Sequence, residues 1–273
     1  APEDADGYLL EVEVLQRLDK FDEALSLLEQ IDDIAPDNTS AMIAKIRLYL
    51  RQSNTEQATV VTEQLLAKEP TNATALASFF AIQQSLGNVE TGLERVKQAF
   101  DSNQASETIG LLLGRAALVA NQPKLSLQGL ANINPNRTAP NQFWSLKGVA
   151  LLRDNKVDAA MEHYSLWSSL YPMQEDAVLG QLLILDGQRK YQEALDVSSD
   201  FLAKKDNLQM SFMQSYFYAM MNDAENAKAA LNKIDAQYQP LPFLRGVKAR
   251  IAMLEQRPAD AVDDALIAYE QNK

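Results

Sequence analysis

The hexapeptide Lys20-Phe21-Asp22-Glu23-Ala24-Leu25 decides the fold, because related hexapeptides return along the whole chain. The further copies begin at residues 54, 88, 122, 156, 190, 223 and 257. Their fifth residue is always small and follows the previous one by 34 residues, with one interval of 33: Ala24, Ala58, Gly92, Ser126, Ala160, Ala194, Ala227 and Ala261. Two helices that cross closely leave little room for a side chain, so this pattern predicts a repeated helix pair.

The period and the fixed small residue resemble the tetratricopeptide repeat. The fit is best between residues 141 and 174, where the aromatic, small and proline positions of that family hold Trp144, Gly148, Ala160, Tyr164 and Pro172. The resemblance covers essentially the whole chain. It implies an all-α, right-handed superhelical solenoid of about eight helix–turn–helix repeats, which begin near residues 5, 39, 73, 107, 141, 175, 208 and 242.

The array is continuous in sequence, although single positions depart from the pattern. Gly110 stands where repeat four should have its aromatic residue. No low-complexity linker interrupts the repeats, so residues 1–273 are predicted to form one solenoid domain, a fragment or the mature part of a longer protein. The last helix, expected at about 258–271, has no solvating helix behind it, which favours packing against a partner or a second copy.

Composition excludes several classes of function. The chain has 25 Lys+Arg and 37 Asp+Glu, a net charge of −12, which argues against a nucleic-acid partner. It has no cysteine, one histidine (His163, expected to face solvent or the next repeat) and no phosphate-binding or metal-binding motif. We therefore expect no cofactor and no enzyme activity. No apolar stretch is long enough for a transmembrane segment.

Arginine is concentrated at particular positions of the repeat. In proteins of the resembled family, positions 2, 5, 9, 12 and 13 of each repeat line a concave groove. Six of the eleven arginines and no lysine fall there: Arg17, Arg47, Arg51, Arg115, Arg153 and Arg250. Guanidinium groups bind carboxylates or phosphates in two-pronged fashion, so this predicts a track for an acidic peptide or an anionic polysaccharide. Alternatively, these arginines pair with helix ends and acids of their own chain.

The segment 210–221 is unusually rich in aromatic residues and methionine. Phe212 and Tyr216 are four residues apart and share one face of a helix, where they form a candidate binding surface; plain core packing is the alternative. Trp144 and Trp167 are predicted to pack in the core.

The acidic excess is concentrated at the start of the chain. Residues 1–40 contain twelve acids and two bases, a charge of −10. Acidic ends of repeat arrays serve solubility, and contact with a basic partner is the functional alternative.

These features favour a non-catalytic scaffold for a protein, peptide or anionic polysaccharide. Residues 144–191 are similar to the carboxyl-terminal repeats of bacterial envelope lipoproteins linked with exopolysaccharide production and the PEP-CTERM sorting system. That resemblance implies a periplasmic or outer-membrane-associated protein rather than a cytoplasmic one. The alternatives are a cytoplasmic peptide-binding adaptor or co-chaperone, and a homo-oligomeric array formed through the last helix.

Overall fold

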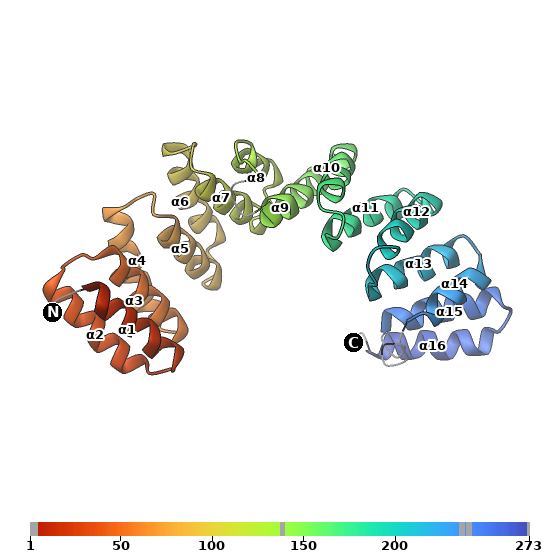
Figure 1. The fold of residues 1–273 in the computed structure, drawn as a ribbon, viewed down its shortest axis with the longest axis horizontal. Coiled ribbons are helices and arrows are strands. Elements are labelled where there is room, and N and C mark those ends of the chain that lie inside the picture. The colour runs from red at the N-terminus through yellow and green to blue at the C-terminus, as the bar shows by residue number, and fades with distance from the viewer. Residues whose placement is uncertain (1–4, 137–139, 235–237, 239–241, 272–273) are drawn as a thin grey trace. The chain divides into compact units, whose positions relative to one another are not determined.

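The structure is a computed structural model that describes residues 5–136, 140–234, 238 and 242–271. Within these ranges it contains 16 α-helices and no strand, which confirms the all-α prediction (Figure 1). The chain divides into two compact units, residues 1–154 and 155–273, and each is described by itself. That all 273 residues form one domain stays a prediction.

Each repeat contributes an A helix followed by a B helix. The first unit contains α1 (Ala5–Arg17), α2 (Phe21–Ile34), α3 (Thr39–Arg51), α4 (Thr55–Lys68), α5 (Ala73–Ser85), α6 (Val89–Ser102), α7 (Glu107–Val119), α8 (Pro123–Leu130) and α9 (Pro140–Arg153). The second unit contains α10 (Val157–Leu170), α11 (Glu175–Gly187), α12 (Tyr191–Leu202), α13 (Leu208–Met220), α14 (Ala224–Asn232), α15 (Pro242–Leu254) and α16 (Pro258–Gln271). The A helices, which carry odd numbers up to α15, begin at or within one residue of the predicted repeat starts. Even-numbered helices are B helices.

The A helices begin at the predicted places because polar side chains cap them. Asn38, Asn72 and Asn207 each accept a hydrogen bond through Oδ1 from the N–H three residues later, at 3.0, 3.0 and 2.9 Å. Ser106 does the same through Oγ at 3.3 Å. Each cap satisfies an N–H that has no partner within the helix, so the caps fix the register at which a repeat starts.

The A helix ends in the same way in every repeat. Its fifteenth position always has a positive φ, between 55° and 79°, and only one of the eight residues there is a glycine: Asp19, Ser53, Gly87, Asn121, Asn155, Arg189, Asn222 and Gln256. The next N–H then bonds to the carbonyl five residues earlier, as from Lys20 to Leu15 (2.9 Å) and from Arg257 to Ala252 (2.8 Å). This Schellman arrangement reverses the chain between the A and B helices.

The small residues that predicted the fold are buried between paired helices. Ala24, Ala58 and Ala160 are wholly buried. In repeat four the closest approach occurs elsewhere, because a Cβ added to Gly110 would lie 2.5 Å from the carbonyl oxygen of Gly129. The missing aromatic residue at Gly110 is thus explained by direct contact between the backbones of α7 and α8.

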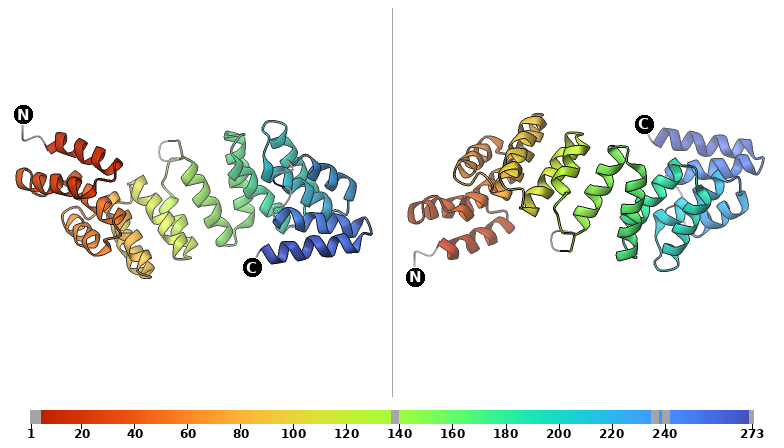
Figure 2. Two further views of the ribbon diagram at one scale, coloured as in Figure 1. Left: turned by 90° about the horizontal axis from the view of Figure 1, so that it is seen from below. Right: turned by 90° about the horizontal axis from the view of Figure 1, so that it is seen from above.

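Within each unit, the A helices other than α1 and α9 pack between two B helices. For example, α3 contacts α2 and α4, and α13 contacts α12 and α14. Successive A helices also touch one another, from α1 to α9 in the first unit and from α13 to α15 in the second. Figure 2 shows the antiparallel helix pairs of each unit from two further sides. The A helices of the first unit therefore form a continuous row, and the A helices of both units carry the predicted binding residues.

Candidate functional site

A pocket of about 420 Å³ lies between the A helices α13 and α15 of the second unit. It is lined by Phe212, Tyr216, Ala219, Met220, Gly246, Val247 and Arg250. Five of these, all except Ala219 and Val247, lie at the fifth, ninth or thirteenth repeat positions. Three of the lining residues, Phe212, Tyr216 and Arg250, were predicted from the sequence as ligand-binding residues, and they lie in one pocket.

The wall of the α13–α15 pocket is aromatic. The rings of Phe212 and Tyr216 are stacked, with centroids 6.4 Å apart and planes at 29°. The Tyr216 hydroxyl donates a hydrogen bond of 3.1 Å to Asp186 Oδ1 on α11. Burial, and then the negative charge of Asp186, raises the pKa of Tyr216 to about 12, so the side chain is a neutral donor at ordinary pH. The hydrogen bond fixes the ring, and its apolar face remains for a ligand.

Arg250 supplies the positive charge of the pocket. Its Nη2 donates a hydrogen bond of 2.9 Å to Asn222 Oδ1, and the residue is otherwise exposed. An amide oxygen holds the guanidinium in place without cancelling its charge, whereas a carboxylate would cancel it. The pocket therefore combines an apolar wall with an oriented cation.

Gly246 keeps one side of the pocket open. A Cβ added there would meet nothing within 4 Å, so packing does not require a glycine at this position. Helix interiors usually favour alanine over glycine by about 1 kcal/mol. A glycine in the middle of α15 is thus unexplained by stability, and its visible effect is free space beside Phe212 and Tyr216.

Three of the predicted arginines bind their own chain instead of lining an open site. Arg17 pairs with Glu13 on α1 at 2.6 Å. Arg51 Nη1 donates a hydrogen bond of 2.8 Å to the carbonyl oxygen of Gln16. Its Nη2 forms an ion pair of 2.9 Å with Asp19, and the guanidinium lies 5.0 Å from the centre of the Phe21 ring.

Arg153 acts in the same way as Arg51. Its Nη1 donates a hydrogen bond of 2.7 Å to the carbonyl oxygen of Leu118. Leu118 is the twelfth residue of repeat four, and Gln16, the acceptor for Arg51, is the twelfth residue of repeat one. Both arginines therefore bond to the end of the preceding A helix, where a cation is favourable. For these residues the alternative interpretation, pairing within the chain, explains the sequence pattern.

Arg47 and Arg115 are different, because both are exposed and neither has a hydrogen bond or ion pair to the described residues. They lie at the ninth repeat position on α3 and α7, two repeats apart on the A-helix row of the first unit. Their guanidinium groups are the ones in this row that remain available to an anion.

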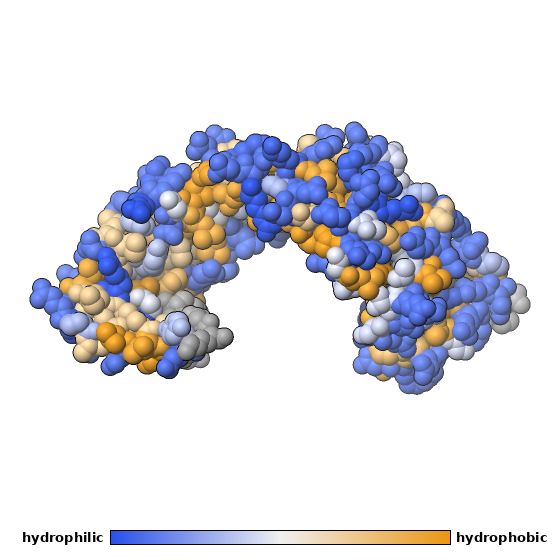
Figure 3. All heavy atoms as spheres, turned by 180° about the vertical axis from the view of Figure 1, so that it is seen from behind, coloured by the Kyte–Doolittle hydropathy of each residue, from blue (hydrophilic) through white to orange (hydrophobic). Residues whose placement is uncertain are grey.

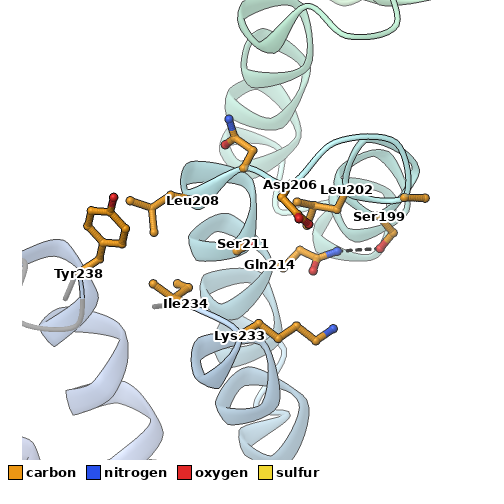
Figure 4. A pocket seen from close by; sticks show the side chains of 11 residues that line it. Ser199, Leu202, Asp206, Leu208, Ser211, Gln214, Lys233, Ile234 and Tyr238 are labelled. Carbon is orange, nitrogen blue, oxygen red and sulfur yellow. Dashed lines mark hydrogen bonds between the residues drawn. The ribbon is translucent and has the colours of Figure 1, made fainter. Parts of the chain in front are cut away.

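A larger cavity of about 760 Å³ lies between α12, α13 and the residues Lys233, Ile234 and Tyr238 (Figure 4). Three of its polar side chains already have hydrogen-bond partners. Gln214 Nε2 donates a hydrogen bond of 2.8 Å to Ser199 Oγ, which is the dashed line in Figure 4. Asn207 caps α13 through its side chain. The cavity contains no residue that the sequence predicted as ligand-binding.

The other candidate residues have structural roles. Trp144 and Trp167 are buried, as predicted. His163 is buried too, so of its two predicted settings solvent is wrong, and contact with the next repeat stays a prediction; its ring lies 5.9 Å from that of Tyr164, edge to face. Among the described residues no group of three or more His, Asp or Glu side chains is placed to hold a metal ion. None of the helices described here is long and apolar enough to cross a bilayer.

Hydrophobic residues on the face shown in Figure 3 form separate areas between hydrophilic ones. Single apolar side chains on a surface need no explanation.

Comparison with known proteins agrees with the repeat register. Residues 15–81 match the tetratricopeptide repeat family. The described residues form 16 helices in A–B pairs with a 34-residue period, so the fold is that of a tetratricopeptide repeat solenoid.

Solved structures share this fold. The carboxyl-terminal part of a repeat protein from Cytophaga hutchinsonii has a TM-score of 0.63 at 14% identity, covering 94% of this chain and 99% of that one. A tetratricopeptide repeat protein from Parabacteroides merdae has a TM-score of 0.60 at 15% identity, with coverage of 85% and 92%. PilF of Pseudomonas aeruginosa has a TM-score of 0.56 at 19% identity, with coverage of 77% and 96%. These likenesses show the fold.

The BBSome complex member bbs-4 of Caenorhabditis elegans is 25% identical over 203 residues. The match covers 72% of this chain and 43% of that protein, so the chain spans less than half of its relative. Tetratricopeptide repeats bind protein partners, and the fold therefore supports a protein-interaction scaffold.

The sequence pattern missed two features of the site. Gly246 gave no signal, because one glycine in a helical segment is usually read as a tolerated defect. Asn222 was not predicted either; its backbone has a positive φ, and its Oδ1 accepts a hydrogen bond from Arg250.

Proposed function

We propose that this chain is a non-catalytic scaffold that binds an extended, acidic polypeptide segment on its A helices. The observation that carries this is the α13–α15 pocket, in which an apolar wall of Phe212 and Tyr216 lies beside the oriented cation of Arg250. Such a site fits an aromatic or aliphatic side chain close to a carboxylate in the same peptide.

The free arginines of the first unit support an acidic ligand. Arg47 and Arg115 would bind carboxylates by salt-sensitive, two-pronged hydrogen bonds. An anionic polysaccharide offers the same carboxylates but no apolar side chain. Dependence on the α13–α15 pocket therefore distinguishes a peptide ligand from a polysaccharide.

The test uses a fluorescent acidic peptide with one central phenylalanine, its alanine counterpart and a polyuronate. Gly246→Phe should fill the pocket and weaken binding of the phenylalanine peptide by about tenfold, since burial of one such side chain contributes about 1.5–3 kcal/mol. Gly246→Ala is the matched control and should bind normally. Arg250→Gln should weaken binding and reduce its dependence on salt.

Equal binding of the phenylalanine and alanine peptides, unaffected by Gly246→Phe, would reject the pocket. Polyuronate binding that is lost in Arg47→Gln/Arg115→Gln but kept in Gly246→Phe would identify a polysaccharide scaffold instead.

The cellular setting is a separate proposal. The similarity of residues 144–191 to bacterial envelope lipoproteins supports a periplasmic or outer-membrane-associated scaffold for exopolysaccharide assembly. Cell fractionation of the full-length protein tests this, because recovery in the cytoplasm would favour an adaptor or co-chaperone.

A further inference from the structure

The larger cavity of the second unit, which Figure 4 shows, is separate from the A-helix surface discussed above. We refer to it as the α12–α13 cavity; its volume is about 760 Å³. Helix α13 contributes Leu208, Ser211 and Gln214, the first, fourth and seventh residues of repeat seven. None of the residues that line the cavity is at the second, fifth, ninth, twelfth or thirteenth repeat position, and none lines the α13–α15 pocket.

The preceding repeat contains an equivalent cleft, which serves as an internal reference. It has a volume of about 340 Å³ and lies between α10, α11 and α12. Gln181 lines this cleft as Gln214 lines the larger cavity; both are the seventh residues of their repeats, and they are 7% and 9% exposed. Both ends of the Gln181 amide have partners, since Nε2 donates a hydrogen bond of 2.9 Å to Ser168 Oγ and Oε1 accepts one of 3.4 Å from Ser165 Oγ.

The amide of Gln214 has a partner at one end. Its Nε2 donates a hydrogen bond of 2.8 Å to Ser199 Oγ, whereas no group of the described residues donates to Oε1. Ser199 corresponds to Ser165, but Leu202 stands where the other serine, Ser168, is found one repeat earlier. An amide oxygen that is largely buried without a donor is costly, so a donor on a ligand would be bound favourably.

The α12–α13 cavity also has polar side chains where the smaller cleft has apolar ones. The fourth residue of the A helix is Ser211 instead of Val178, and the thirty-second residue of the repeat before it is Asp206 instead of Pro172. Lys233 adds an amine. The side chains of Ser211, Asp206 and Lys233 have no hydrogen bond or ion pair with the described residues.

The two charges of the cavity come from different walls. Figure 4 shows Asp206, which precedes α13, and Lys233, which follows α14, on opposite sides of the Gln214 amide. In the smaller cleft the charged residues are Asp200 and Lys204, four residues apart at the end of a single helix. The larger cavity can therefore bind a ligand between an anion and a cation, with an amide oxygen in the middle.

This order of groups is complementary to a dipeptide. A dipeptide has an ammonium group, a peptide N–H and a carboxylate along its length, and a site of several hundred Å³ is of the size that takes small molecules. The apolar side chains of Leu202, Leu208 and Ile234 line the same cavity and offer contact to an apolar side chain of the ligand.

We propose that the α12–α13 cavity binds a dipeptide with free termini. The ammonium group lies at Asp206 and the carboxylate at Lys233. The peptide N–H between them donates to Gln214 Oε1. This site is independent of the function proposed for the A helices.

The probe is the dipeptide Ala-Leu at millimolar concentration, titrated calorimetrically into the 273-residue chain. The comparison ligands are its N-acetyl form, its C-terminal amide, its ester analogue with oxygen in place of the peptide N–H, and free leucine. Each should bind at least about tenfold more weakly than Ala-Leu, because each lacks one of the three polar contacts or cannot span the two charges.

The variants assign each terminus to its side chain. Asp206→Asn should weaken binding of Ala-Leu by about tenfold but change binding of the N-acetyl form little, since that ligand has no ammonium group. Lys233→Gln should weaken Ala-Leu by a similar factor and change binding of the C-terminal amide little. Both residues are exposed, so circular dichroism should show unchanged helicity.

Asp200→Asn/Lys204→Gln is the matched control, because it removes the two exposed charges of the smaller cleft, and it should bind Ala-Leu normally. Gly246→Phe should also leave this binding intact, which separates it from the proposed groove function. Absence of heat with Ala-Leu, equal binding of the blocked forms, or a loss in the control variant equal to that in Asp206→Asn would overturn the proposal.

Discussion

Gly92 on α6 lies directly against Phe80 on α5: a Cβ on Gly92 would come within 2.9 Å of Phe80 Cδ2 and 3.3 Å of Phe80 Cα. The two residues occupy the eighth and twentieth positions of repeat three, where helices A and B cross. Repeat five has a small residue at both positions, Gly148 in the A helix and Ala160 in the B helix. A large residue on one helix is thus accommodated by the absence of a side chain on the other.

Gly92→Ala should therefore destabilise the protein by about 1 kcal/mol or more, although alanine is the better helix former. In a Phe80→Ala background the same change should cost little, because the ring that it meets is gone. Urea denaturation of the unchanged protein, the two single variants and the double variant gives the coupling energy between Gly92 and Phe80. Additive effects would show that the two residues do not constrain each other.

Two other glycines should respond in opposite directions to alanine. A Cβ on Gly246 meets nothing, so Gly246→Ala should stabilise the protein by roughly 0.5–1 kcal/mol. A Cβ on Gly180 would lie 2.4 Å from the Tyr164 ring, so Gly180→Ala should destabilise it by about 1–3 kcal/mol. Thermal unfolding of the two variants is the measurement. A change of Tm in the same direction for both variants would contradict the packing described.

The arginines at the thirteenth position should act on stability and leave ligand binding unchanged. Arg153→Met keeps the aliphatic chain but removes the donor to the Leu118 carbonyl, at a cost of about 1 kcal/mol. Hydrogen exchange at the end of α7 should become faster, because this carbonyl terminates the helix. Arg115→Met on the same helix is the control, since its guanidinium has no such bond; faster exchange there as well would contradict the assignment.

Stability should fall at high pH through Tyr216. Its pKa is about 12 in the folded chain against 10.0 as the ordinary value, so the folded protein holds this proton more strongly. The contribution of Tyr216 to stability is present below pH 10 and is lost as pH rises towards 12. Urea midpoints of Tyr216→Phe should depend less on pH in this window. An identical slope for both proteins would place the titration on other tyrosines.

The sequence predicted the fold closely because its decisive residues act locally. Ala24 and its equivalents are required wherever two helices cross, and the turn before each of them recurs at a fixed distance. The binding residues were harder to predict. Arg51 and Arg115 occupy equally plausible groove positions, but the first reaches a carbonyl of the preceding repeat. Which arginine is free depends on its neighbour one repeat away, and the pattern of a single repeat does not contain that information.

The left-handed residues that end the A helices have an energetic consequence. Seven of the eight positions hold a side chain in a conformation that usually costs about 1 kcal/mol, less for asparagine. Each of these turns is therefore a place where replacement by glycine can relieve backbone strain locally. Since they recur once in every repeat, the rigidity of individual repeats can be tuned one turn at a time, with the pocket residues left unaltered.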